Sequence, residues 1–281
     1  MIIARTVSDV RRAVKAWRKE GLTVGLVPTM GYLHEGHASL VKAAKASCDR
    51  VVVSVFVNPT QFGPNEDLES YPRDFEHDCA LLEDLGTDLV FHPEPTELYF
   101  PDASTWVEVP SLAQNLCAKT RPTHFRGVCT VVSKLFHIAA PDKAFFGQKD
   151  AQQLAVIRRM VRDLNFDLEI VGCPIVREAD GLAKSSRNTY LNPKERQAAL
   201  VLNHSLKKAY SLIEAGETDT NKLLAVIKEC IAAEPLAKLD YAEAVDADSM
   251  KPLAAVTGNV LFAIAVYIGK TRLIDNFLVS R

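Results

Sequence analysis

Short apolar segments alternate with amphipathic segments through the first two thirds of the chain, and this alternation restricts the fold more than any other feature. The apolar segments have the length of buried strands and span 22–27, 51–57, 87–91, 143–146 and 167–171. Between them, residues 39–48, 74–85, 128–139 and 151–164 carry apolar side chains three and four positions apart, as helices do. Apolar strands that alternate with helices indicate a parallel sheet covered on both faces. We therefore expect an α/β fold with a Rossmann-like, doubly wound parallel sheet.

The alternation of strand-like and helix-like segments ends at about residue 175. Two helical segments, 193–215 and 221–233, precede three strand-like segments at 239–245, 260–268 and 272–278. This order predicts a smaller C-terminal α+β domain. We expect a Rossmann-like domain at 1–175 and this α+β domain at 176–281.

Charge and cysteine content exclude several classes of partner and compartment. The net charge of the 281 residues is -2, so no broad basic surface for nucleic acid or anionic membrane is expected. The N-terminus lacks the features of a signal peptide, and the apolar segment 260–268 is too short to span a bilayer as a helix. The six cysteines form no Cys-x-x-Cys pair. We interpret them as reduced thiols of a cytoplasmic protein.

The sequence Pro-Thr-Met-Gly-Tyr-Leu-His-Glu-Gly-His at 28–37 follows the first predicted strand and precedes a helix. In doubly wound sheets this turn binds ligands, and the following helix N-terminus attracts phosphate. His34 and His37 are three positions apart, so both imidazoles can face an α-phosphate, and Gly36 allows a nucleotide to approach closely. A structural role near the turn is the alternative for both histidines.

A second polar segment, Gly-Leu-Ala-Lys-Ser-Ser-Arg-Asn at 181–188, combines hydroxyl groups with cations. Physically it fits a mobile phosphate clamp, a polar hinge between domains, or both. The His-x-Gly-His motif and this segment together resemble the nucleotidyltransferase superfamily, which includes the class I aminoacyl-tRNA synthetases.

Four further segments narrow the resemblance to one family. They are Val-Ser-Val-Phe-Val-Asn-Pro-Thr-Gln-Phe-Gly at 53–63, Tyr-Pro-Arg at 71–73, Arg-Pro-Thr-His-Phe-Arg-Gly-Val at 121–128 and Phe-Gly-Gln-Lys-Asp-Ala-Gln-Gln at 146–153. In this order they resemble the pantothenate synthetase (pantoate–β-alanine ligase) family over residues 28–191. The resemblance implies a homodimer that joins pantoate to β-alanine with ATP and Mg²⁺, through a pantoyl adenylate. It also implies that the domain at 1–175 binds ATP and pantoate and that the domain at 176–281 is a lid.

Neutral amides follow the second predicted strand, at the carboxyl edge of the sheet. Asn58 and Gln61 there can hydrogen-bond a hydroxy acid without neutralising its nucleophilic carboxylate. The alternative is an ordinary turn at the Asn-Pro pair. The resemblance places Gln153 across the acid pocket from Gln61.

The segment 147–150 repeats the strand–glycine–helix order of the first motif. Gly147 permits close approach of a ribose, Lys149 can reach a phosphate, and Asp150 can accept from ribose hydroxyl groups. A helix N-cap is an equally good interpretation of Asp150.

The resemblance implies that Asp78 binds Mg²⁺, and a solvated helix aspartate is the alternative. The chain departs from the family at His77, where many members are acidic, and at Lys184, where they commonly have Met.

The resemblance assigns catalysis to His34 and His37 and substrate binding to Asn58, Gln61 and Gln153. The residues expected to contact ATP lie in three segments and at residue 176: Met30, Gly31, Tyr32, Leu33, His34, Glu35, Gly36, His37, Gly147, Gln148, Lys149, Asp150, Val176, Lys184, Ser185, Ser186 and Arg187. Two rival functions are a nucleotidyltransferase with a phosphate or nucleotide acceptor, and a non-catalytic nucleotide-binding protein. Cations would be expected in a phosphate acceptor pocket, and a non-catalytic protein would not need both motifs intact.

Overall fold

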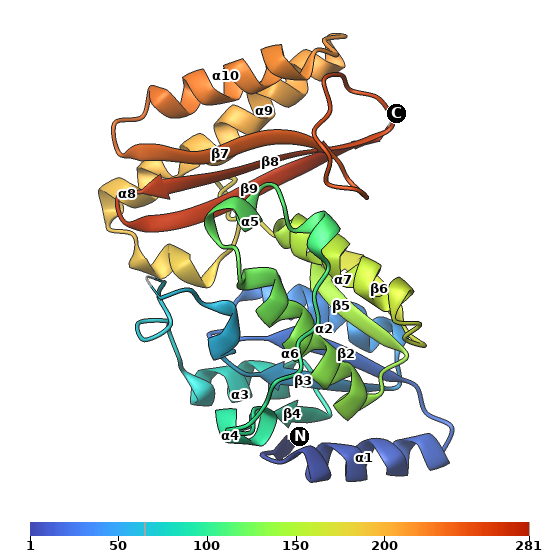
Figure 1. Cartoon of the computed structure of the whole chain (residues 1–281). Coiled ribbons are helices and arrows are strands. Elements are labelled where there is room, and N and C mark those ends of the chain that lie inside the picture. The colour runs from blue at the N-terminus through green and yellow to red at the C-terminus, as the bar shows by residue number, and fades with distance from the viewer. Residues whose placement is uncertain (65, 281) are drawn as a thin grey trace. The chain divides into compact units, whose positions relative to one another are not determined.

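The computed structural model describes residues 1–64 and 66–280, and its first part is built on a six-stranded sheet (Figure 1). The strands follow the order β1-β4-β3-β2-β5-β6, and every neighbouring pair is parallel. Their bounds are β1 Ile2–Ala4, β2 Val24–Thr29, β3 Arg50–Val55, β4 Leu89–Phe91, β5 Lys143–Gly147 and β6 Glu169–Cys173. The chain reverses its direction of travel across the sheet at β2, so the doubly wound fold is confirmed.

Helices cover this sheet on both faces. They are α1 Val7–Lys19, α2 Glu35–Ser47, α3 Phe75–Asp84, α4 Pro95–Leu98, α6 His124–Ala139 and α7 Ala151–Asp163. Helix α2 packs against α3, and α1 packs against α6 (Figure 1). In the central strand β3, Val51, Val53 and Val55 join the core under α2, and Val52 is buried as well. A strand buried on both faces explains the unbroken apolar run in its sequence.

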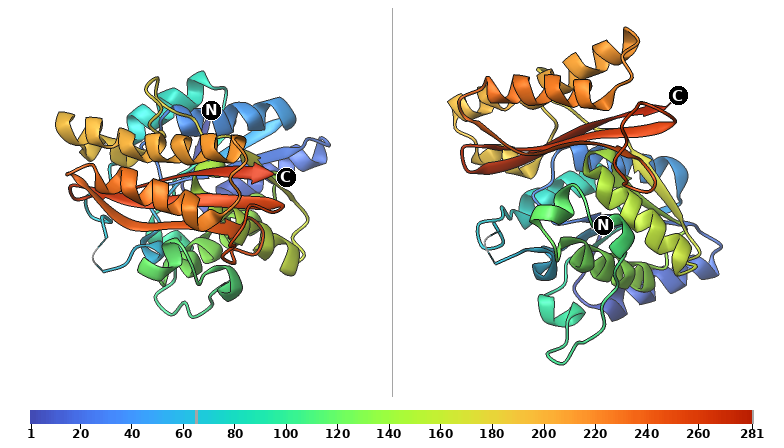
Figure 2. Two further views of the ribbon diagram at one scale, coloured as in Figure 1. Left: turned by 90° about the horizontal axis from the view of Figure 1, so that it is seen from above. Right: turned by 45° about the horizontal axis from the view of Figure 1, so that its top comes forward.

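The second sheet is antiparallel and has the order β7-β8-β9, with β7 Ala237–Asp246, β8 Asn259–Ile268 and β9 Thr271–Ser280. Helices α8 Pro193–Ala198, α9 Leu200–Glu214 and α10 Thr220–Ala232 precede it. In both views of Figure 2, α9 and α10 lie beside each other over one face of this sheet.

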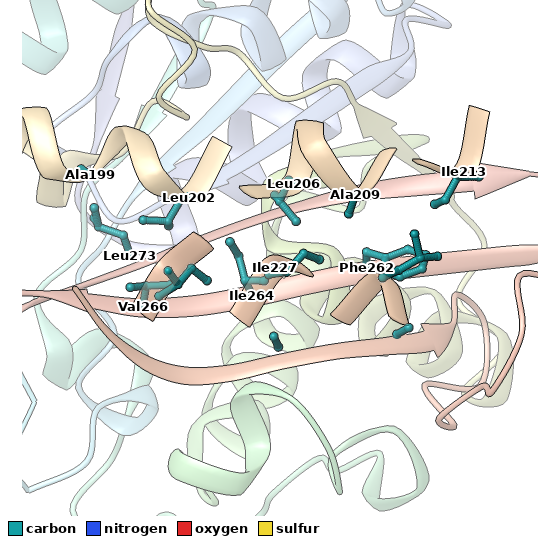
Figure 3. Packing of buried hydrophobic residues seen from close by; sticks show 14 of the residues in the cluster. Ala199, Leu202, Leu206, Ala209, Ile213, Ile227, Phe262, Ile264, Val266 and Leu273 are labelled. Atoms are coloured by element: carbon teal, nitrogen blue, oxygen red, sulfur yellow. The ribbon is translucent and has the colours of Figure 1, made fainter. Parts of the chain in front are cut away.

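The core of this second part forms between the helices and that face. Residues 199, 202, 206, 209 and 213 recur three and four apart along α8 and α9, and Figure 3 shows them facing Phe262, Ile264 and Val266 of β8. Alternate residues of a strand share one face, so the spacing of two in β8 matches the helical spacing above it. The α+β order predicted for the C-terminal part is confirmed.

The chain forms two compact units. Unit 1 contains Met1–Pro110, Arg121–Gln148 and Val156–Pro174, and unit 2 contains Ser111–Thr120, Lys149–Ala155 and Ile175–Arg281. The predicted domains 1–175 and 176–281 differ from these units in the two short segments, one of which includes α5 Cys117–Thr120.

Several elements differ from the sequence predictions. Strand β1 and helix α1 were not predicted, although Val10, Val14 and Trp17 form a buried stripe and the side chain of Thr6 caps the helix. The single helix predicted over 193–215 is two helices, α8 and α9, which meet at Ala199. All six cysteines are free thiols, as predicted. Within the described part of the chain, every helix is too short or too polar to cross a membrane.

Candidate active site

The turn between β2 and α2 is held in a conformation that few sequences adopt. Gly31 and Tyr32 both have positive φ, at 84° and 51°. A Cβ at Gly31 would lie 3.0 Å from both Asp78 Oδ2 and Val55 Cγ1, so conformation and space both favour glycine. The turn ends at His34, the N-cap of α2. The motif thus forms the first turn of α2, which begins four residues before the predicted helix 39–48.

His34 and His37 form a capping box on α2. The amide of Gly36 donates to His34 Nδ1 at 3.0 Å, and the amide of His34 donates to His37 Nδ1 at 3.3 Å. The two ring centroids are 4.2 Å apart. Because both Nδ1 atoms accept, each neutral ring carries its proton on Nε2. Capping therefore fixes the tautomer that can donate from Nε2 to a phosphate oxygen.

Asp78 of α3 holds the same turn from the other side. Its Oδ2 accepts from the amide of Tyr32 at 2.8 Å, and its Oδ1 accepts from the amide of Leu33 at 2.6 Å. The residue is only 1% exposed, and this burial raises the pKa of its carboxyl group, although the two amides lower it. Asp78 therefore fixes the conformation of the turn that carries both histidines.

These contacts of Asp78 do not suit a direct Mg²⁺ ligand. Mg²⁺ favours octahedral oxygen ligands and keeps several waters, whereas both oxygens of this buried carboxylate face the backbone. Among residues 1–64 and 66–280, no three or more His, Cys, Asp or Glu side chains group closely enough to hold a metal ion. The assignment of Asp78 to Mg²⁺ stays a prediction that its contacts do not favour.

The predicted amide pair lies beside the Met30 side chain. Gln61 Nε2 donates to Met30 Sδ at 3.0 Å, and Gln61 Oε1 accepts from Asn58 Nδ2 at 3.1 Å. Asn58 is 1% exposed and caps the 3-10 helix η1, Pro59–Gln61. Its Oδ1 accepts from the hydroxyl groups of Thr60 and Tyr99. Asn58 therefore orients Gln61, and Gln61 links this cluster to the histidine turn.

Helix α6 approaches η1 so closely that only glycine fits at the contact. A Cβ at Gly127 would lie 2.6 Å from both the backbone nitrogen and Cα of Gln61. The carbonyl of Gly127 also accepts from Asn58 Nδ2 at 3.1 Å. Gly127 thus sets the distance between α6 and the backbone of Gln61.

Three residues of the described chain support the Gln61 backbone. The Gln61 carbonyl is 2.9 Å from His124 Nδ1 and accepts a 3.4 Å bond from Arg121 Nη2. Arg121 in turn pairs with both carboxylate oxygens of Glu66, each at 2.6 Å. Burial raises the pKa of Glu66, but the hydrogen bonds and charge of Arg121 outweigh it, so the pKa is lowered overall.

Glu66→Gln is expected to lower Tm by roughly 2–4 °C at neutral pH, which corresponds to about 1 kcal/mol for a chain of this size. The folded-state pKa of Glu66 lies below the ordinary value of 4.5, so its ion pair stabilises the fold fully above that pH. The contribution is lost as the pH falls through the folded-state pKa. Melting curves from pH 7 to pH 3 should therefore converge for the variant and the parent, whereas exposed Glu69→Gln should match the parent throughout.

Gly147 and Gln148 belong to unit 1, and unit 2 contains the other remaining predicted residues. Lys149 and Asp150 end the 3-10 helix η3, Gln148–Asp150, and their side chains pair at 3.3 Å. Gln153 lies half-buried in the first turn of α7. The buried neighbour Gln152 instead bonds the backbone of Leu112, Asn115 and Cys117. The ribose and N-cap interpretations of Asp150 both remain open.

The Lys/Ser-rich segment is an ordered hairpin and helix turn. The amide of Lys184 donates to the carbonyl of Val176 at 2.9 Å, and Lys184 Nζ pairs with Glu178 at 2.8 Å. Ser185 caps the 3-10 helix η4, Ser186–Tyr190, by accepting from the amide of Arg187. The structure therefore brings Val176, Lys184, Ser185, Ser186 and Arg187 into one folded segment.

No sequence pattern indicates a role for Tyr99, Glu66 or Gln152. Tyr99 and Glu66 lie in loops whose sequences contain no periodic signal. Their partners, Asn58 and Arg121, are more than forty residues away in sequence. Gln152 belongs to the segment 146–153, in which the resemblance assigns substrate binding to the neighbouring Gln153. Its position on the buried stripe of α7 would have distinguished the two amides.

Three comparisons place this geometry among known proteins. The model of the pantoate-beta-alanine ligase family matches residues 2–278. The chain is 57% identical over 277 residues to a pantothenate synthetase of Clostridium acetobutylicum, covering 99% of each. It is 58% identical over 277 residues to one of Enterococcus faecalis, covering 99% of this chain and 98% of that relative.

Solved structures agree with these relatives. A pantothenate synthetase from Thermus thermophilus superposes with a TM-score of 0.93 at 44% identity, covering 99% of each chain. A pantoate-beta-alanine ligase from Francisella tularensis, complexed with beta-gamma ATP and beta-alanine, gives a TM-score of 0.79 at 36% identity. That match covers 99% of this chain and 97% of the Francisella chain.

Proposed function

We propose roles for the site residues on the premise that this chain belongs to the pantoate-beta-alanine ligase family. The protein is a ligase that condenses pantoate with β-alanine at the expense of ATP. It forms pantothenate, AMP and pyrophosphate through a pantoyl-adenylate intermediate. The observation that carries this conclusion is the identity of 57–58% over nearly the whole chain. The rival acceptor chemistry and the non-catalytic role are inconsistent with that match.

In the first step the pantoate carboxylate attacks the α-phosphorus of ATP and pyrophosphate leaves. Negative charge grows on the non-bridging oxygens of that phosphorus in the transition state. We assign to His34 and His37 the donation of hydrogen bonds from Nε2 to those oxygens. The capping box supports this assignment, because it fixes both rings before substrate binds. Catalysis is then positioning and charge stabilisation, with no nucleophilic side chain.

Gln61 and Gln153 orient pantoate in this proposal. Gln61 is supported at its backbone and at its side chain, as expected for a residue that must hold a carboxylate in line with phosphorus. Asn58 acts through Gln61, because its own amide bonds protein groups on every side. Pantoate thus meets a neutral amide, which leaves its carboxylate nucleophilic.

The cations of unit 2 bind the ATP phosphates in this proposal. Lys149, Lys184 and Arg187 hold the β- and γ-phosphates, and Gly147 and Asp150 face the ribose. Lys149 and Arg187 lie on the short 3-10 helices η3 and η4, and the Ser185 cap of η4 supports a preformed donor at Arg187. The other proposed ATP contacts are Met30, Gly31, Tyr32, Leu33, Glu35, Gly36, Gln148, Val176, Ser185 and Ser186.

Mg²⁺ is proposed to reach the protein on the ATP phosphates. When bound it would neutralise phosphate charge, and no step here depends on a protein ligand for it. A cytoplasmic homodimer, and a lid role for residues 176–281, are further proposals that follow from the family.

Turnover of pantoate labelled with ¹⁸O in its carboxylate is expected to place one labelled oxygen in AMP. The carboxylate oxygen that attacks phosphorus stays with AMP when the amine of β-alanine displaces it from the acyl carbon. Mass spectrometry of AMP and pantothenate measures the transfer, with unlabelled pantoate as the control. Label in inorganic phosphate, with ADP as the co-product, would instead demonstrate an acyl-phosphate route.

A further inference from the structure

Two consecutive residues of β9 contact the two segments of unit 2 to which the proposed function assigns phosphate binding. Asp275 and Asn276 are polar, yet they are only 2% and 6% exposed. Neighbouring side chains of a strand point to opposite faces of its sheet. Leu273 and Val279 belong to the core under α9 and α10, so Asp275 shares that face and Asn276 points to the other.

Asn276 holds the segment that carries Lys149. Its Nδ2 donates to the carbonyl of Lys149 at 2.8 Å. The acceptor belongs to the main chain of the residue itself, so the bond fixes the point from which the Lys149 side chain extends. Gln152 anchors the same segment one helical turn further along, through the backbone of Leu112, Asn115 and Cys117.

Asp275 holds the hairpin that leads into Lys184. It accepts two parallel bonds from Arg177, at 2.7 Å from Nη1 and 2.9 Å from Nη2. Arg177 Nη1 also donates to the carbonyl of Gly181 at 3.1 Å, which ties the hairpin turn to the same ion pair. The backbone of Arg177 bridges to Ala183, the residue before Lys184.

The two contacts are joined within the strand, because the amide of Asn276 donates to Asp275 Oδ1 at 2.8 Å. Bidentate Arg–Asp pairs and buried amide bonds restrict orientation more than single exposed contacts do. A buried polar pair is costly unless its hydrogen bonds are made. Here the side-chain bonds to Lys149 and to the 177–183 hairpin offset that cost.

We propose that Asp275 and Asn276 are positioning residues that hold Lys149 and Lys184 in register for the phosphates of one nucleotide. The inference rests on the proposed function, because it takes from there the assignment of both lysines to ATP. It adds that β9, which contributes no proposed ligand to ATP, determines how tightly the triphosphate binds.

The test measures the dissociation constants of ATP and of inorganic pyrophosphate, with the KM for pantoate as an internal reference. Asn276→Ala and Asp275→Asn should each weaken binding of both phosphate ligands about tenfold, the usual effect of one lost buried hydrogen bond. The KM for pantoate should not change. Two other substitutions in unit 2 are the matched controls. Asn115→Ala removes a comparable amide bond to the carbonyl of Met250, and Asp240→Asn removes a comparable ion pair with Arg272.

The outcomes separate this inference from the proposed function. If Lys149→Ala weakens ATP binding but the β9 variants behave like their controls, the inference is wrong and the ATP assignment stands. If Lys149→Ala and Lys184→Ala leave ATP binding intact, the ATP assignment itself fails. Should Asp275→Asn not fold, Arg177→Lys keeps the charge, removes the bidentate geometry and is expected to show the same loss of pyrophosphate binding.

Discussion

His37→Ala is expected to slow adenylate formation about 10²–10³-fold while ATP still binds. The variant loses the Nε2 donor that faces the α-phosphate in the proposed mechanism. It also loses the Nδ1 acceptor of the capping box, which costs about 0.5–2 kcal/mol of stability. Release of pyrophosphate from ATP and pantoate, without β-alanine, measures the adenylation step directly.

Two substitutions separate capping from catalysis at this position. Asparagine can place its Oδ1 near the position of Nδ1, so His37→Asn should keep the cap and a parental Tm but still lose adenylation. Glutamine can place an N–H near the position of Nε2, so His37→Gln should recover part of the rate. The exposed His204→Ala is the histidine control. Near-normal pyrophosphate release by His37→Asn would remove His37 from the mechanism.

Gly127→Ala is expected to reduce kcat/KM for pantoate at least about 10²-fold and to lower stability. Glycine to alanine within a helix usually stabilises by about 0.5–1 kcal/mol. Here the new methyl group would meet the Gln61 backbone at 2.6 Å, and overpacking of that kind costs about 1–3 kcal/mol. The clash therefore outweighs the helix propensity. The 3-10 helix must move, and a displacement of about 1 Å in a positioning residue can cost 10²-fold in rate.

Steady-state kinetics with pantoate and ATP varied separately, together with a melting curve, measure both effects. Binding of ATP should change little, because the clash is confined to α6 and η1. Gly63→Ala is the matched control, since its nearest new contact would be at an ordinary 3.7 Å. A parental kcat/KM for pantoate in Gly127→Ala would show that the 3-10 helix yields without moving Gln61.

The sequence predicted the parallel sheet and the α+β order because both depend on local periodicity. The apolar run of β3 and the heptad-like stripe of α9 can be recognised in single segments. Strand β1 has only three residues and lies at the sheet edge, so it offers too short a pattern to recognise. The division at Ala199 falls within a continuous helical pattern, where no proline or glycine marks it.

Sequence motifs predict candidate ligand-binding residues but do not reveal the contacts that support them. His34, His37 and Gln61 stand in short motifs whose residue types suit phosphate and carboxylate. Asp78, by contrast, acts on amides more than forty residues earlier in the chain. No spacing in a sequence reveals such a contact, and the Mg²⁺ role that the family resemblance implies for Asp78 stays a prediction. The need for glycine at position 127 likewise comes only from its contact with the backbone of Gln61, 66 residues away in sequence.

Unit 2 is built from segments that are far apart in the sequence, and this limits how the chain can be divided. Asp240, Tyr241 and Glu243 of β7 contact Thr120, Cys117 and Lys119, all of which come from a segment made long before the strand. A fragment that began at residue 176 would leave these partners of β7 unmatched and would lack Gln152 as well. The C-terminal sheet is therefore not a transplantable module. During synthesis, residues 111–120 and 149–155 can complete their packing only after the later segment of unit 2 has been made.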